Sequence, residues 1–139
     1  MSPANSLFLL AESREHPMHV GALELFVPPE GADAVDVRDM FLAAVASGEV
    51  APLFQKRARR SMSSLGQWGW EPDDAFDLEH HVRAGALPRP GRVLDLLSLC
   101  SQLHSGLLDR HRPLWDVHLI EGLADGRFAL YFKIHHALV

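Results

Sequence analysis

The chain has 139 residues, 47% of them hydrophobic, which is enough for one core and too short for two comfortable domains. The formal net charge of −5 argues against nucleic-acid binding, because such proteins usually present a positive surface. One cysteine excludes an internal disulfide and suits a reducing compartment. With no signal peptide and no apolar run of about 20 residues, we expect a soluble or peripheral cytoplasmic protein.

A helix, a strand and a second helix are predicted at the start of the chain. Residues 1–11 are mildly apolar and favour a short helix. Residues 19–27 are typical of a strand, which two prolines and a glycine end. Asp36 is expected to cap the second helix, and Gly48 stands where a C-terminal glycine belongs.

The only basic cluster follows this helix and consists of Lys56, Arg57, Arg59 and Arg60. Two interpretations are open. The cluster can be the solvated face of a strand or loop, which is the usual role of a charge run. Alternatively, it can contact phosphates of a nucleotide cofactor or of a lipid head group.

Further extended segments and one long helix are predicted in the middle of the chain. Residues 68–70 and 76–84 are expected to be extended, and the proline-rich residues 87–91 break the chain. An apolar stripe at helical spacing begins at Val93 and predicts the longest helix, which Pro113 should end.

The end of the chain predicts a β-hairpin. Residues 114–123 and 127–136 form its two strands, and Asp125-Gly126 is a strong turn signal between them. Together with the preceding elements, this hairpin indicates an α+β fold with a largely antiparallel sheet.

The last strand divides into two faces when it is read with a period of two. One face carries Phe128, Leu130, Phe132, Ile134 and His136, and the other carries Arg127, Ala129, Tyr131, Lys133 and His135. We expect the first face to pack, with His136 as a titratable group at the tip of a rigid element. His135 should then lie on the opposite side, held by hydrogen bonds or solvent.

A His-His dipeptide alone is weak support for a site, because the chain has nine histidines and two such pairs. For His80-His81 a structural or surface role is the simpler interpretation. His135-His136 differs in its context, because it ends a clean apolar face after a hairpin. Neither HExxH nor paired cysteines occur, so no metal site is expected.

Several segments in order resemble the bacterial wax ester synthase/acyl-CoA:diacylglycerol acyltransferase family. Residues 108–123 read LDRHRPLWDVHLIEGL and residues 132–139 read FKIHHALV, beside the family's LDR-x-RPLW, IEGL and HHxxxDG. Residues 18–21, 76–78 and 87–91 also match, so the likeness covers nearly the whole chain.

The resemblance implies a chloramphenicol-acetyltransferase-like fold, in which two similar lobes enclose a channel. Residues 1–139 would be the N-terminal lobe and end inside the HHxxxDG motif, because its Asp-Gly would follow Val139. The C-terminal lobe is then expected to be absent from this chain.

By the same resemblance, the expected reaction moves a long-chain acyl group from acyl-CoA to diacylglycerol or to a long-chain alcohol. His136 would be the general base and His135 its support. The signature Pro113, Leu114 and Trp115 would line the substrate channel or serve packing. Acyl-CoA is a substrate here, and no cofactor is implied.

For the basic cluster, the phosphate-binding interpretation then becomes contact with the CoA phosphates, and the solvated-face interpretation stays open beside it. The C-terminal half of the same protein and a peripheral membrane or lipid-droplet surface are the other expected partners. Two alternatives remain open at this point. One is an HHxxxDG enzyme that uses carrier-bound thioesters, as peptide-condensation domains do. The other is a non-catalytic or metal-binding module built on the nine histidines.

Overall fold

A computed structural model describes residues 1–139 and contains four α-helices and six strands. The helices are α1 (Pro3–Ala11), α2 (Ala34–Ser47), α3 (Leu78–His81) and α4 (Val93–Ser105). The strands are β1 (His19–Phe26), β2 (Lys56–Arg60), β3 (Trp68–Pro72), β4 (Val82–Ala86), β5 (Trp115–Glu121) and β6 (Phe128–His135). None of the helices combines the length and the apolar character that crossing a membrane would need.

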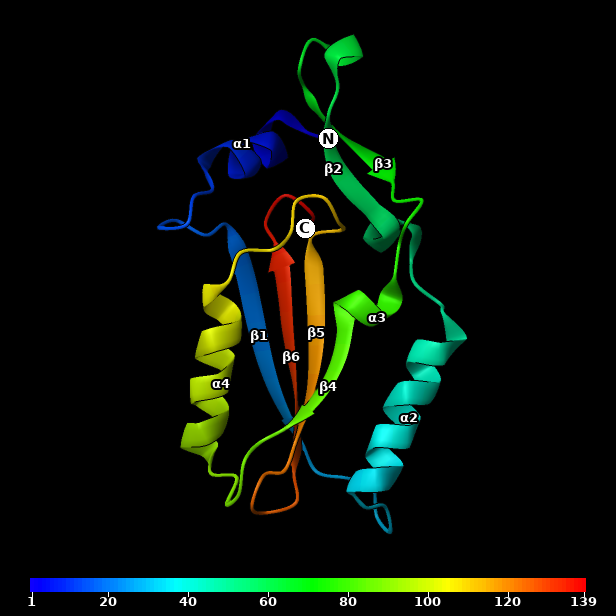
Figure 1. Ribbon diagram of the computed structural model, residues 1–139, viewed down its shortest axis with the longest axis vertical. Coiled ribbons are helices and arrows are strands. Elements are labelled where there is room, and N and C mark those ends of the chain that lie inside the picture. The colour runs from blue at the N-terminus through cyan, green and yellow to red at the C-terminus, as the bar shows by residue number, and fades with distance from the viewer.

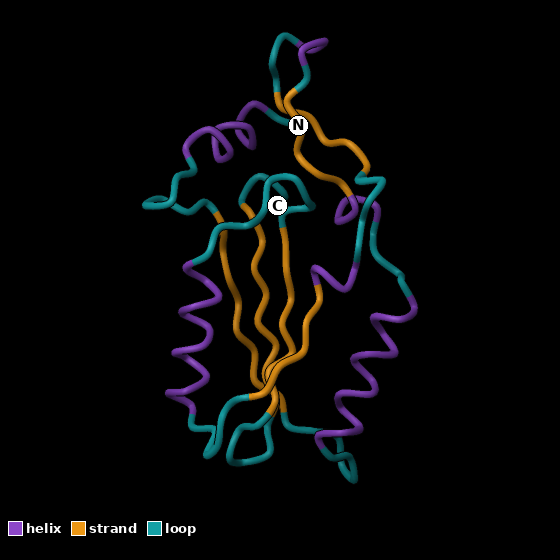
Figure 2. Tube along the Cα trace, viewed as in Figure 1, coloured by secondary structure: helices purple, strands orange, loops and turns teal.

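The main sheet has the order β1-β6-β5-β4, so the predicted last strand lies in its interior (Figure 1). β6 is antiparallel to both neighbours, whereas β4 and β5 are parallel. β2 and β3 form a separate antiparallel hairpin beyond the carboxyl end of β6 (Figure 2). The predicted α+β class with a largely antiparallel sheet is therefore confirmed.

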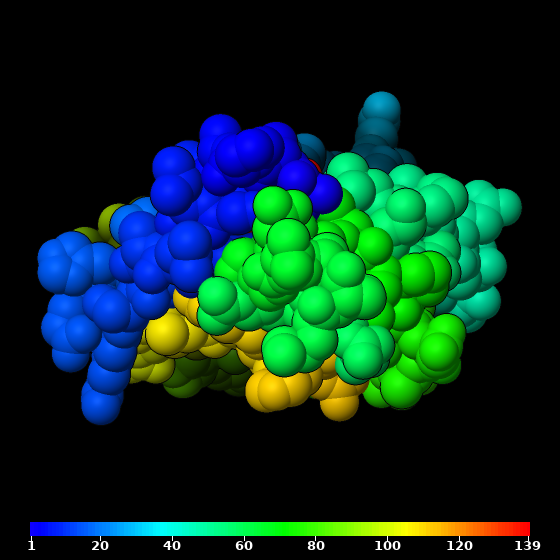
Figure 3. Space-filling view, turned by 90° about the horizontal axis from the view of Figure 1, so that it is seen from above, coloured from blue at the N-terminus to red at the C-terminus, as the bar shows by residue number.

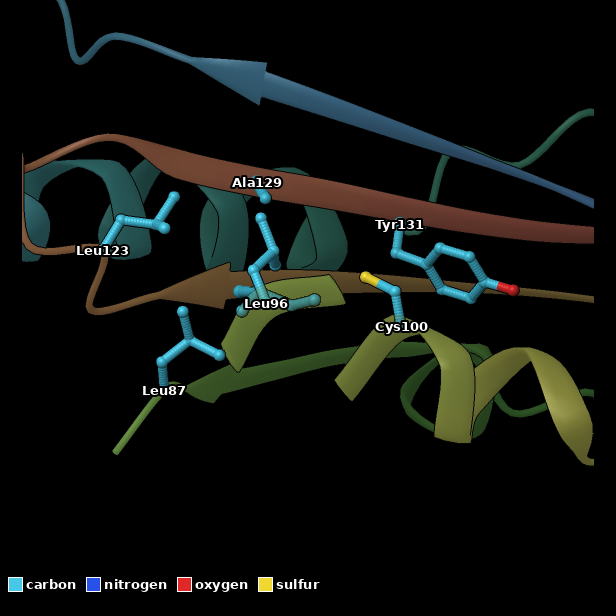
Figure 4. Packing of buried hydrophobic residues seen from close by; sticks show 7 residues of the cluster. Leu87, Leu96, Cys100, Leu123, Ala129 and Tyr131 are labelled. Atoms are coloured by element: carbon cyan, nitrogen blue, oxygen red, sulfur yellow. The ribbon is translucent and has the colours of Figure 1, made fainter. Parts of the chain in front are cut away.

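The principal core lies between α4 and one face of this sheet (Figure 4). Leu96 on α4 is completely enclosed, and Cys100 one turn later is also buried. Fully burying a leucine side chain contributes about 1.5–3 kcal/mol, so this contact fixes α4 on the sheet. The cluster consists of Leu87, Leu96, Cys100, Ile120, Leu123, Ala129 and Tyr131.

A second apolar cluster joins α1 and the β2–β3 hairpin to the end of the chain. It contains Leu9, Ala58, Leu108, Leu114 and Ala137. Seen from above, α1 and the hairpin hide almost all of the C-terminal segment (Figure 3). Ala137 and Leu138, which follow β6, are consequently buried by elements that lie far away in the sequence.

Three local predictions were wrong. Asp33, not Asp36, caps α2, because its carboxylate accepts the N–H groups of Val35 and Asp36, and Asp36 closes the capping box in return. α4 ends at Ser105, well before Pro113, and α2 is one residue longer than α4. The segment expected to be extended throughout residues 76–84 instead turns through α3 before β4 begins.

Candidate active site

The two faces of β6 separate as the period of two predicts, but their burial is the reverse of what was expected. Ala129, Tyr131, Lys133 and His135 are buried on the side of α4. Phe128, Leu130, Phe132 and Ile134 are only half-buried on the opposite side. The apolar face is therefore the more open one, and the polar face lies inside the protein.

Lys133 shows how the polar face is accommodated. Its ammonium donates to the carbonyl oxygens of Leu103 (2.6 Å) and Gly106 (2.8 Å), where α4 ends. These carbonyls have no partner within the helix, and a cation also suits the negative end of the helix dipole. Burial lowers the pKa of Lys133, and the carboxylate of Asp116, 3.9 Å away, opposes that shift.

His136 lies directly after β6 and is partly exposed. Its backbone N–H donates to the carbonyl oxygen of Met18 at 2.8 Å, which extends the β1–β6 pairing by one bond. The ring of Phe8 on α1 stacks on the imidazole, with ring centres 5.0 Å apart and planes at 22°. The backbone and one ring face of His136 are therefore held.

His135 is completely buried. Its Nδ1 accepts the backbone N–H of Ala137 at 3.0 Å, which closes the turn that contains His136. Its Nε2 lies 3.2 Å from Oε2 of Glu12, although the N–H does not point squarely at that oxygen. Burial lowers the pKa of His135, and the charge of Glu12 opposes this effect. The imidazole of His135 is thus a neutral, enclosed group.

Glu12 belongs to the candidate site although no sequence pattern points to it. It follows α1 in a segment that reads as a polar connection, yet its side chain is only 1% exposed. Arg110 donates twice to its Oε1, at 3.1 and 2.9 Å. The two residues are 98 positions apart, so only the folded structure brings them together.

An apolar groove of about 550 Å³ runs between α2 and the open face of the sheet. Phe132 and Ile134, which precede His136 on that face of β6, form part of its wall. Its lining residues are Phe41, Ala44, Val45, Glu49, Val50, Ala51, Phe54, Leu78, Val82, Trp115, Val117, Phe132 and Ile134. The volume is typical of sites that take small organic molecules.

The signature residues Pro113, Leu114 and Trp115 divide between the core and the groove. Pro113 and Leu114 are fully buried, so they pack and contact no solvent. Trp115 borders the groove, and its indole N–H donates to the carbonyl oxygen of Phe54 at 2.7 Å. Only the third residue of this signature could contact a molecule in the groove.

The basic cluster forms β2 and is largely paired within its own hairpin. Arg57 and Arg59 both bind the carboxylate of Glu71 on β3, at 2.9 and 2.8 Å. Arg60 donates to the carbonyl oxygen of Gly66 at 2.6 Å. Lys56 takes part in neither of these ion pairs. The cluster is thus not brought into contact with His135 or His136.

His19 and His81, two of the remaining histidines, are buried and take part in packing. His81 is buried between the rings of Trp115 and Phe76, and its Nδ1 lies 2.7 Å from the carbonyl oxygen of Trp115. His19 Nε2 donates to the carbonyl oxygen of His104 at 2.7 Å. The structure brings no three His, Cys, Asp or Glu side chains together in a way that could hold a metal ion.

Residues 1–139 match a protein family described as the wax ester synthase/diacylglycerol acyltransferase catalytic domain. A Mycobacterium tuberculosis protein assigned by name to the diacylglycerol O-acyltransferases is 59% identical over 139 residues, which are 100% of this chain and 31% of that protein. The wax ester synthase/diacylglycerol acyltransferase of Marinobacter aquaeolei VT8 has 50% identity and a TM-score of 0.92, with 100% of this chain and 34% of that chain covered.

A more distant likeness concerns the fold alone. The starter condensation domain of rhizomide synthetase is 14% identical with a TM-score of 0.67, and the match covers 99% of this chain and 30% of that one. This chain thus spans about a third of the length of the relatives that it matches. That share is consistent with the expected N-terminal lobe of a CoA-dependent acyltransferase fold.

Proposed function

The chain belongs to the wax ester synthase/diacylglycerol acyltransferase family, and on that premise we propose that it contributes the base to an acyl-CoA-dependent O-acyltransferase. The acceptor is the hydroxyl group of diacylglycerol or of a long-chain alcohol, and the product is a triacylglycerol or a wax ester. One observation carries this assignment: His136 is partly exposed at the tip of β6, whereas His135 is sealed inside.

The reaction needs a base because a hydroxyl group has negligible acidity at neutral pH. His136 removes the hydroxyl proton while the oxygen attacks the thioester carbonyl carbon. A C–O bond forms, the C–S bond breaks, and the imidazolium returns the proton to the departing CoA thiolate. A positioned base of this kind contributes about 10²–10⁴-fold to the rate. No covalent acyl-enzyme is required.

The surroundings of His136 suit alkyl substrates. Phe8 stacks on its ring, and Phe132 and Ile134 precede it on the open face of β6. For the CoA phosphates we propose Lys56 together with Arg59 and Arg60. These residues belong to β2, a strand of the hairpin that lies above the end of β6 (Figure 1).

We further place the protein in the cytoplasm, peripherally at a membrane or lipid inclusion, where its hydrophobic acceptors reside. Leu7 and Leu10 of α1 are 64% and 59% exposed, and they offer an apolar contact to such a surface. Co-sedimentation with diacylglycerol-containing vesicles, reduced in a Leu7→Ser/Leu10→Ser variant, is the expected result. Equal sedimentation of both proteins would remove α1 from this role.

The activity is best tested in a chimera in which residues 1–139 replace the corresponding third of the Marinobacter enzyme, which is 50% identical there. The assay follows transfer from labelled acyl-CoA to diacylglycerol and to a long-chain alcohol. We expect His136→Ala to lower kcat at least 10²-fold, because the base is lost. We expect residues 1–139 alone to give no transfer, since the rest of the channel is then missing.

His16→Ala is the matched control, because His16 is an exposed histidine that lies apart from both the groove and the basic cluster. An active His136→Ala chimera would refute the assignment of the base. If His135→Ala instead abolished turnover with an unchanged thermal melt, the roles of the two histidines would have to be exchanged. Transfer from a carrier-bound thioester but not from acyl-CoA would favour the condensation-domain alternative.

A further inference from the structure

Glu12 is a buried carboxylate that the proposed reaction does not use directly. It lies in the loop between α1 and β1, and its side chain is 1% exposed. A buried carboxylate is destabilising unless its charge is paired and its oxygens accept hydrogen bonds. Its partners therefore show what the structure gains from placing it there.

Both carboxylate oxygens of Glu12 are engaged. Oε1 accepts two hydrogen bonds from the guanidinium of Arg110, at 3.1 and 2.9 Å, which compensates the charge. Oε2 accepts the backbone N–H of Met18 at 3.2 Å and also lies 3.2 Å from Nε2 of His135. One carboxylate thus joins α1, the start of β1, the segment before β5 and the end of β6.

The hydrogen bond to Ala137 fixes the tautomer of His135. A backbone N–H can only donate, so Nδ1 of His135 must be unprotonated. In the neutral imidazole the proton is then on Nε2, the nitrogen that faces Glu12. Protonation of Nδ1 would break the bond to Ala137 and loosen the turn that holds His136.

Glu12 also reaches His136 by a second route through the backbone. Met18, whose N–H is bound to Glu12, accepts the N–H of His136 through its own carbonyl oxygen at 2.8 Å. The carboxylate therefore fixes the residues on both sides of His136: Met18 across the sheet and the imidazole of His135 before it.

We propose that Glu12 is a positioning residue for His136, which it orients through His135 and Met18, with Arg110 as the countercharge. This inference rests on the proposed role of His136 as the base. Glu12 has no contact with the His136 imidazole and is not itself a catalytic residue. The groups that face His135 are Glu12, Arg110 and His19, and among them only Glu12 carries a negative charge.

The wild-type 139-residue chain allows a direct test of the tautomer. Long-range ¹H–¹⁵N spectra of the histidine rings distinguish an Nε2–H tautomer from an Nδ1–H tautomer or an imidazolium. We expect His135 to be a pure Nε2–H tautomer between pH 7 and pH 8. An Nδ1–H tautomer or an imidazolium in that range would overturn the proposal without any variant.

Glu12→Gln tests the consequence for the reaction in the chimera described above. The amide keeps the shape of the side chain but removes the charge. It also replaces one acceptor oxygen with an N–H donor, which then faces a group that now donates a hydrogen bond to Glu12. We expect kcat to fall about 10- to 100-fold, because small misplacements of reacting groups have effects of this size. KM for acyl-CoA and for the acceptor should change less than about threefold, since Glu12 contacts neither.

The control is Glu15→Gln, an exposed glutamate in the same loop, which should leave kcat unchanged. Values are compared per folded molecule, with thermal melts of each variant. If kcat of the Glu12→Gln chimera, calculated per folded molecule, equals the wild-type value, Glu12 is a purely structural residue. If His136→Ala stays active, the assignment of the base fails instead. The same spectra of the Glu12→Gln chain, compared with wild type, then still decide what Glu12 does to His135.

Discussion

Gly91 allows the sharpest prediction about the fold, because its backbone touches that of Gly122. It has a φ of +74°, a left-handed value that is unfavourable for residues with a Cβ. A Cβ at position 91 would overlap the carbonyl oxygen of Gly122 and lie 2.9 Å from its carbonyl carbon. The obstacle is main chain, so no side-chain rotation can relieve it.

The same contact holds two of the family's segments together. The N–H of Ala124 donates to the carbonyl oxygen of Gly91 at 2.9 Å. The N–H of Leu87 donates to the carbonyl oxygen of Glu121 at 2.8 Å. These bonds attach the connection before α4 to the turn after β5. A Cβ that separates the two backbones would weaken both bonds.

Gly91→Ala is therefore expected to combine two effects. The left-handed conformation costs about 1–2 kcal/mol for a residue with a Cβ. Overpacking adds about 1–3 kcal/mol, and the upper part of that range is appropriate because backbone must move. We expect the free energy of unfolding to fall by about 3–5 kcal/mol, measured by urea denaturation of the chain with the slope m held in common.

Gly126→Ala is the matched control, because Gly126 has a similar φ of +81° but a Cβ added there would meet no atom within 4 Å. It should show the conformational effect alone, about 1–2 kcal/mol. The difference between the two variants isolates the clash. Equal losses of stability in both would refute the argument that the Gly91–Gly122 contact is what requires glycine.

Three further predictions concern charges and titration. Lys133→Met should lower the free energy of unfolding by about 2–4 kcal/mol, because it leaves the carbonyls of Leu103 and Gly106 unpaired at the end of α4. Denaturant melts measure this change, and a decrease below about 1 kcal/mol would contradict the argument. Burial lowers the pKa of His81, so the unfolded state binds more protons than the folded state below about pH 6.5 and stability should fall as the pH drops from 7 to 5. His81→Gln should flatten that dependence in thermal melts, whereas an unchanged slope would exclude His81 as a source. Arg59→Glu/Arg60→Glu in the chimera should raise KM for acyl-CoA more at low salt than at high salt; an unchanged KM at low ionic strength would leave β2 as solvated surface.

Local patterns predicted the C-terminal hairpin because each of its signals acts over a few residues. The Asp125-Gly126 turn joins β5 and β6, and Gly126 has the positive φ that such a turn requires. The alternation along β6 also holds, since successive side chains must point to opposite faces of a strand. What alternation could not predict is which face the rest of the protein covers.

Errors arose where a periodic pattern continued past the element that it described. Leu107 and Leu108 extend the apolar stripe of α4, but the helix has already ended at Ser105. Leu108 is buried in the second cluster with α1 and β2, not against the sheet beside Leu96. A helical stripe and a buried loop residue look alike in sequence, and only the packing partner tells them apart.

Glu12 and Arg110 were missed for a different reason. A glutamate in a polar segment and an arginine in a charged one are normally solvated, so neither residue suggests burial. Arg110 does lie in the LDR-x-RPLW segment that carries the resemblance, which was the one signal in the sequence. The pairing itself depends on tertiary contacts between residues 98 positions apart, for which a single sequence contains no pattern.

The inverted burial of β6 connects the fold to the proposed reaction. On the buried face of β6, Tyr131 contacts His104 at 2.7 Å and Lys133 binds the end of α4. His135, on the same face, lies beside Glu12. Each polar group on that face thus has a neighbour from another part of the fold. Such a network is rigid, because moving one member leaves a buried group unpaired. The apolar face is left half-open. An exposed apolar surface of this kind usually binds a ligand or another protein segment. In the proposed enzyme that partner would be an alkyl substrate or a segment of the further length that the relatives have. In the reaction that we propose, the fixed polar side would support His136 and the open apolar side would receive the hydrophobic acceptor.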